Sequence, residues 1–186
     1  MIRTFIAVTI PADIKKRISA YQRQLREYDV HIRWVKPVSM HLTLKFLGDT
    51  APERIPAIAD AVKDAAAYTP PFSVTVGGCG CFPHIKRPRV IWIGITAGDE
   101  QLCRVAADLE NSLERIGHKK DNRPYSPHIT LGRIKSQRNI QSLIPAMDQD
   151  WQGGTFSVDH ITVMKSELNP AGAVHKPLHT IELEGK

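Results

Sequence analysis

Apolar residues recur along the chain with two periods, which predict an alternation of strands and helices. Continuous or alternating apolar runs are typical of strands, and they lie at residues 4–9, 32–35, 40–48, 72–76, 89–96, 128–134, 155–168 and 174–184. Apolar residues at helical spacing predict helices at residues 11–25, 52–67, 101–116 and, interrupted by Pro145, 139–149. We expect a long loop over residues 77–88 and a turn at residues 169–172.

This order indicates a mixed α and β fold. The second half of the chain loosely echoes the first, because each half carries a related motif strand followed by a helix and further strands. We infer an internal duplication with a pseudo-twofold axis. At 186 residues we expect residues 1–186 to form one domain with two lobes.

The related motif is His-x-Thr-Leu, which occurs at His41 and again at His128. The composition would produce roughly 0.03 copies by chance. Side chains alternate between the two faces of a strand. In the first copy this assigns Leu42, Leu44 and Phe46 to the core and the opposite face to His41, Thr43 and Lys45. In the second copy it assigns Ile129 and Leu131 to the core and the opposite face to His128 and Thr130.

If the duplication brings the two motif strands together, their polar faces line one cleft that holds two His and two Thr. Such a cleft suits in-line displacement at phosphorus, which needs a base for the incoming oxygen and an acid for the leaving oxygen. Imidazoles with ordinary pKa values near ~6.5 can do both at neutral pH. Thr hydroxyls can donate hydrogen bonds to phosphate oxygens. Arg133 adds positive charge after the second motif, and Lys45 is its nearest counterpart in the first.

A weaker string, His-x-Thr, occurs at His160, where roughly 0.5 copies are expected by chance, so we assign His160 to the sheet. A zinc site built from His41 and His128 would need a third ligand, and neither motif supplies a neighbouring Asp, Glu or Cys. We therefore expect no metal and no cofactor. The three Cys are interpreted as reduced thiols, with metal binding as the alternative.

The net charge of +6 and two basic runs, at residues 84–89 and 118–123, suggest an anionic partner. No apolar run approaches the ~20 residues of a membrane span, and the run at residues 5–10 is too short for a signal peptide. We expect a cytoplasmic protein without a membrane partner.

The paired motifs resemble the two-histidine phosphoesterase superfamily, specifically the RNA 2′,3′-cyclic phosphodiesterases of bacteria and archaea, also called the 2′-5′ RNA ligase family. "MHLTLKFLG" and "SPHITLGR" look like the two signature motifs, and "RTFIAVTIP", "RVIWIGI" and "FSVDHITVMKSEL" are similar to other strands of the family. The resemblance implies an α+β fold with two pseudo-symmetric lobes, each an antiparallel sheet backed by helices, with the active-site cleft between them. His175 stands where the family leads us to expect an aromatic residue.

The resemblance also implies roles. His41 would be the proton donor to the leaving ribose oxygen, and His128 the proton acceptor that activates water. Thr43 and Thr130 would hold the phosphate oxygens, and Arg133 would contact the phosphate. The expected reaction is metal-independent hydrolysis of RNA 2′,3′-cyclic phosphate ends, or cyclic nucleotides, to 2′-phosphates by a monomer.

Two alternatives stay open. The same residues could join a 2′,3′-cyclic end to a 5′-hydroxyl as an ATP-independent 2′-5′ RNA ligase acting on tRNA-like halves, since no P-loop or nucleotide-activating Lys motif is present. The basic runs also suit a non-catalytic RNA-end binder, whose affinity would depend on salt.

Overall fold

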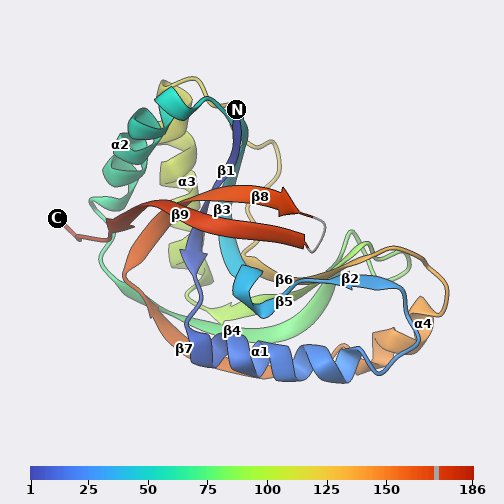
Figure 1. The fold of residues 1–186 in the computed structure, drawn as a ribbon. Helices are drawn as coiled ribbons and strands as arrows, with labels where there is room; N and C mark the ends of the chain where they lie inside the picture. Colours follow the sequence, from blue (N-terminus) through green and yellow to red (C-terminus); the bar gives the residue numbers. More distant parts are fainter. Residues whose placement is uncertain (170–171) are drawn as a thin grey trace.

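A computed structural model describes residues 1–169 and 172–186, and it confirms the mixed α and β fold (Figure 1). Its strands are β1 (Ile2–Thr9), β2 (Ile32–Trp34), β3 (His41–Thr50), β4 (Phe72–Phe82), β5 (Val90–Ala97), β6 (His128–Ile134), β7 (Gln152–Val158), β8 (His160–Asn169) and β9 (Gly172–Glu182). Its helices are α1 (Ala12–Leu25), α2 (Ile55–Ala66), α3 (Asp99–Arg115) and α4 (Ile140–Leu143), with 3₁₀ turns η1 (Pro37–Ser39), η2 (Pro52–Arg54) and η3 (Ile144–Ala146). No helix among the described residues is long and apolar enough to cross a membrane.

Within the described residues the strands form one curled antiparallel sheet in the order β7-β4-β5-β6-β3-β1-β8-β9, with β2 also paired to β6. The two motif strands, β3 and β6, are the middle pair of this order. They share a single paired position, Leu42 opposite Ile129. The sheet therefore consists of two similar halves that meet at the motifs, which confirms the expected pseudo-symmetric architecture.

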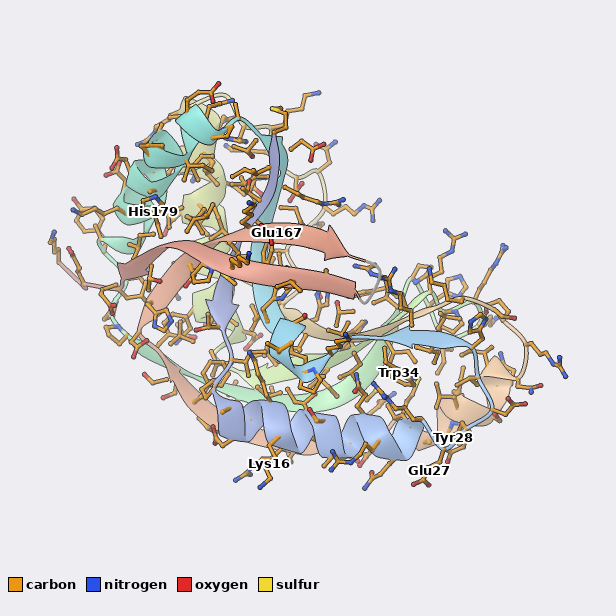
Figure 2. All side chains as sticks on the ribbon, in the orientation of Figure 1. Lys16, Glu27, Tyr28, Trp34, Glu167 and His179 are labelled. Carbon is orange, nitrogen blue, oxygen red and sulfur yellow. The ribbon has the colours of Figure 1, made fainter. Side chains whose placement is uncertain are left out.

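Helices back each half of the sheet, but each half takes segments from both ends of the chain. In Figure 1, α2 and α3 lie together beside β1 and β9, whereas α1 lies along β4 and β7. The chain thus crosses from one lobe to the other after β1. On α1, Ile14, Ile18 and Leu25 are buried at helical spacing, as the sequence predicts. Trp34 of β2 faces the end of α1 (Figure 2), where the Arg26 guanidinium lies 5.6 Å from its ring centre.

Two predictions about chain segments are wrong. The loop predicted over residues 77–88 is strand as far as Phe82, because β4 continues to pair with β5 there. The strand predicted over residues 155–168 is two strands that separate at Asp159, since β7 pairs with β4 of one lobe and β8 with β1 of the other. The turn predicted at residues 169–172 includes residues 170 and 171, which lie outside the described residues.

The simple alternation predicted for β3 fails after Leu44. Ile6 pairs with Lys45 and Ala7 with Thr43, so Leu44 is an extra residue, a β-bulge, on the motif strand. The bulge turns Lys45 into the core, where it is 3% exposed, and turns Phe46 outward, where it is 60% exposed. Lys45 donates to both carboxylate oxygens of Glu110 on α3, at 2.7 and 2.8 Å. Lys45 is therefore not the counterpart of Arg133 in the cleft.

Candidate active site

The bulge is repeated in the second motif, which makes the two motifs geometrically equivalent. On β6, Gly132 pairs with Ile91 and Thr130 with Trp92, so Leu131 is the extra residue. Each bulge falls on the Leu of His-x-Thr-Leu. In this equivalence, Gly132 and Arg133 of the second motif correspond to Lys45 and Phe46 of the first. Both Leu are fully or almost fully buried, and they anchor the strands while the His and Thr point to the other face.

Both motif histidines are held in the same way by the backbone. The Nδ1 atom of His41 lies 2.8 Å from the carbonyl oxygen of Ser39, and the Nδ1 atom of His128 lies 2.8 Å from that of Ser126. A carbonyl oxygen only accepts hydrogen bonds, so each neutral ring carries its proton on Nδ1. The Nε2 atom of each ring is then a free acceptor. In this tautomer each imidazole can take up a proton at Nε2, which acid–base chemistry requires.

The serines were missed by sequence reasoning, although a signal was present. Ser39 and Ser126 stand two residues before the two histidines, so the repeated string is Ser-x-His-x-Thr-Leu. The carbonyl that fixes each ring belongs to the backbone. The Ser39 hydroxyl makes a further hydrogen bond of 2.8 Å to the carbonyl oxygen of Ala173, which ties the start of β9 to the segment before His41.

Aromatic rings flank both histidines. On the first side, the Phe5 ring lies 4.6 Å from that of His41, and His175 packs edge-on against His41 at 4.9 Å. On the second side, the Phe82 ring lies 4.9 Å from that of His128 and 5.1 Å from that of Trp92. His175 thus lies at the position flanking His41, as its place in the last strand pair suggested. These rings partly shield the two imidazoles from solvent.

Burial is the largest influence on the charge of both histidines. It lowers the pKa of His41 to about 4, against the raising effect of the Ser39 carbonyl, and the charges of His175, Lys15 and His128 lower it further. Burial also lowers the pKa of His128, opposed by its backbone hydrogen bond and reinforced by Arg133. In the absence of a bound anion both imidazoles are therefore neutral at pH 7.

Two cations lie close enough to the motif histidines to lower their pKa values. Arg133, predicted from the sequence, is exposed and close enough to lower the pKa of His128. Lys15, in the first turn of α1, is half-buried and lowers the pKa of His41. No sequence pattern marks Lys15, because its approach to His41 depends on how α1 crosses the sheet. Lys15 is therefore a cation on the side of His41, and Arg133 is a cation on the side of His128.

The third His-x-Thr also lies near the cleft. His160 is in the sheet, as predicted, and its Nε2 atom lies 2.8 Å from the hydroxyl of Thr9, the cross-strand partner of His41. Asp159, His160 and Glu182 bring ligand atoms within 4.8 Å of one another, the one such group found among the described residues. The Nδ1 atom of His160 contacts Asp159. Both ring nitrogens of His160 therefore have hydrogen-bond partners in this arrangement.

A cavity of about 450 Å³ lies where β4 meets residues 144–149. Gly80 and Trp92 line it, and the Trp92 ring lies so close to Gly80 that a Cβ atom there would be 2.3 Å from the ring. Neither His41 nor His128 lines this cavity.

Comparison with known proteins gives consistent matches over the whole chain. A family model described as the 2′-5′ RNA ligase superfamily matches residues 10–170. Among curated relatives, a Thermotoga maritima protein is 34% identical over 184 residues, covering 98% of this chain and 96% of the relative. A Methanothermobacter thermautotrophicus protein is 29% identical over 184 residues, covering 98% and 99%. Both relatives are named RNA 2′,3′-cyclic phosphodiesterase.

Solved structures share the fold. A crystal structure of a Thermus thermophilus protein superposes with a TM-score of 0.84, at 28% identity and covering 99% of both chains. The crystal structure of E. coli LigT complexed with 3′-AMP superposes with a TM-score of 0.81, at 26% identity and covering 98% of both chains. The two-lobed arrangement around the motifs is thus shared with these proteins.

Proposed function

Because this chain belongs to the 2′-5′ RNA ligase superfamily, we propose that it hydrolyses 2′,3′-cyclic phosphate ends of RNA to 2′-phosphates by acid–base catalysis at His41 and His128, without a metal. Residues 1–186 act as one two-lobed phosphoesterase domain in this proposal. The observation that carries it is the matched geometry of the two histidines, each with Nδ1 bound to a carbonyl oxygen and Nε2 free. The choice of reaction is supported by the relatives that are named RNA 2′,3′-cyclic phosphodiesterase.

In this mechanism the cyclic phosphate lies between the two motifs. The Nε2 atom of His128 takes a proton from water as the water oxygen attacks phosphorus. The bond from phosphorus to the ribose 3′-oxygen breaks, and the protonated Nε2 of His41 delivers its proton to that oxygen. The product is a 2′-phosphate with a free 3′-hydroxyl, and solvent returns the two histidines to their starting protonation states. The choice of His41 as acid follows the family resemblance, since the local geometry of the motifs is the same.

The hydroxyls of Thr43 and Thr130 donate hydrogen bonds to the non-bridging phosphate oxygens in this proposal. Each Thr follows its His by two residues and shares the same strand face, so both hydroxyls lie beside the imidazoles. Charge grows on these oxygens during attack, and donors fixed in advance stabilise it. Arg133 contributes positive charge on the side of His128. The anionic phosphate in turn raises the pKa of His41, which favours the protonated form that the acid role needs.

The decisive experiment is turnover of a short RNA ending in a 2′,3′-cyclic phosphate, with EDTA present and with 2′- and 3′-phosphate products resolved. We expect a 2′-phosphate. A requirement for an added divalent metal would contradict the metal-independent mechanism, and a 3′-phosphate would contradict the leaving-group assignment. Salt-sensitive binding without turnover would instead identify a non-catalytic RNA-end binder.

The family description also keeps the ligase reaction as a second candidate. There the 5′-hydroxyl of a second RNA takes the place of water at His128, and the product is a 2′-5′ bond. Adding a 5′-hydroxyl oligonucleotide to the same assay separates the two reactions, because ligation lengthens the labelled strand whereas hydrolysis leaves its length unchanged.

A further inference from the structure

Two arginines face each other at one end of the cleft. Arg33 on β2 is the direct cross-strand partner of Arg133 on β6, and both side chains are exposed. Directly opposed residues in an antiparallel pair have Cβ atoms about 5 Å apart. The ion pairs found among the described residues include neither arginine. The structure therefore holds two positive charges side by side with no carboxylate within salt-bridge distance.

The pair lies on the cleft face of the sheet. Ile32, next to Arg33, is buried in the core, so Arg33 points to the opposite face. Across the pair, a Cβ atom on Gly132 would point toward Ile32 and Trp34, on the core side, so Arg133 also points away from the core. The influence of Arg133 on the pKa of His128 agrees with this orientation. The two guanidinium groups consequently extend the line of polar groups that begins at the motif.

The position of this arginine pair, on β2 and β6, separates it from the proposed site of the cyclic phosphate. Thr130 pairs with Trp92 and Arg133 with Val90, two residues apart on β5, so the bulge at Leu131 leaves them about 7 Å apart along the strand at the ~3.3 Å rise of a strand residue. The long side chain of Arg133 can reach back toward the phosphate between the histidines, whereas Arg33 starts from the edge strand β2. Like charges placed directly opposite each other destabilise a sheet. An anion bound between them removes that repulsion, and a guanidinium fork fits two phosphate oxygens.

From this juxtaposition we propose that Arg33, together with Arg133, binds the backbone phosphate on the 5′ side of the terminal nucleotide. The substrate is then the end of an RNA chain rather than a free cyclic nucleotide, which has no such phosphate. This inference rests on the proposed function, because it assumes that the cyclic phosphate lies between His41 and His128. It identifies Arg33 as a residue that determines specificity.

The test compares two substrates in the full-length protein. One is adenosine 2′,3′-cyclic phosphate, and the other is the dinucleotide ApA ending in a 2′,3′-cyclic phosphate. We expect kcat/KM to be about tenfold higher for the dinucleotide, in line with one charge-assisted contact. A dinucleotide whose internal linkage is an uncharged methylphosphonate should lose this preference. Arg33→Gln should reduce the ratio between the two natural substrates to near one, and should lower the salt slope of dinucleotide kcat/KM by about one.

Arg104 provides the matched control, since it is an exposed arginine on α3 outside the ion pairs described. Arg104→Gln should keep the wild-type ratio. Equal kcat/KM for both substrates in the wild type, or an unchanged ratio in Arg33→Gln, would refute the subsite while leaving the phosphodiesterase function in place. If kcat/KM stays higher for the dinucleotide when its linkage is a methylphosphonate, the preference comes from the second nucleoside and not from the phosphate. Absence of turnover with both substrates would contradict the proposed function itself.

Discussion

The hydroxyl of Tyr125 donates a hydrogen bond of 3.0 Å to the main-chain carbonyl oxygen of Thr43. Tyr125 lies three residues before His128, and Thr43 belongs to the motif that begins at His41, so this bond joins the two motifs. Among the described residues, the strands of the two motifs pair directly only at Leu42 and Ile129. The relative position of the two imidazoles therefore depends on the segment that leads into β6.

We expect Tyr125→Phe to lower kcat about tenfold and to change KM less than threefold. The substitution removes one hydrogen bond, and a displacement of His128 by a fraction of an ångström affects the transition state more than substrate binding. Steady-state kinetics on a short cyclic-phosphate RNA measure both constants. Tyr21→Phe is the matched control, because the Tyr21 hydroxyl also donates to a carbonyl over 3.0 Å, that of Ala146. Equal losses of kcat in both variants would argue for a general structural effect.

A second hydrogen bond also joins β3 to the segment that leads into β6. Besides Glu110, the Lys45 ammonium group donates to the carbonyl oxygen of Lys119 over 2.9 Å. Removing one partner of a buried ion pair leaves the other charge uncompensated, so we expect Lys45→Met to lower the free energy of unfolding by about 3 kcal/mol. Urea denaturation measures this change. Lys120→Met, which breaks the exposed pair with Glu114, should cost less than about 1 kcal/mol. A cost this small for Lys45→Met would contradict the buried-pair interpretation.

The sequence predicted the motif strands and the faces of His41, Thr43, His128 and Thr130, because strand alternation over three residues is a local property. It failed at Lys45, since one extra residue in a bulge reverses every later side chain and no single-sequence pattern marks that residue. The separation of β7 from β8 was missed for a related reason.

The separation of β7 from β8, like the hydrogen bond of Tyr125, depends on which segments far apart in the sequence lie together. Residues on either side of Asp159 both have strand character, so periodicity alone joins them into one element. The different partners, β4 and β1, become visible only in the folded sheet. Local propensity therefore predicts most of the elements and the residues of the two motifs, whereas the contacts that position the motifs depend on tertiary pairing.

Substitution of either motif histidine by Ala should lower kcat/KM by about 10²–10⁴ with the fold retained, since in the proposed mechanism each ring transfers a proton in the transition state. Circular dichroism and urea denaturation verify folding, and the cyclic-phosphate assay gives the rate. His179→Ala is the control, because His179 is exposed on β9 at the end near α2 (Figure 2). Near-normal rates in both His41→Ala and His128→Ala would rule out the acid–base mechanism.

The pH dependence of stability follows from the partly buried position of His41. Its pKa is about 4 in the folded chain, below the ordinary value of 6.5, so between these values the unfolded chain binds more protons. Stability should therefore rise with pH through this window, and be lost as pH falls from 6.5 toward 4. The full shift corresponds to on the order of 3 kcal/mol. His41→Gln should flatten the dependence. Urea denaturation at pH 4.5, 5.5 and 7 in both proteins provides the comparison, and parallel curves would contradict the depressed pKa.

The same lowered pKa values determine the pH profile of the reaction. The productive free enzyme has one protonated and one neutral imidazole, and kcat/KM reports the pKa values of that free enzyme. Burial lowers the pKa of both His41 and His128, so the fraction with a protonated acid falls as pH rises above the higher pKa. We expect kcat/KM to peak below pH 6.5 and to decrease toward pH 8. Lys15→Met removes a charge that lowers the pKa of His41, and should therefore move the profile to higher pH. Lys16→Met, on the exposed side of α1 (Figure 2), should leave it in place. A maximum at pH 8 in the wild type would show that the acid is not His41 with its lowered pKa.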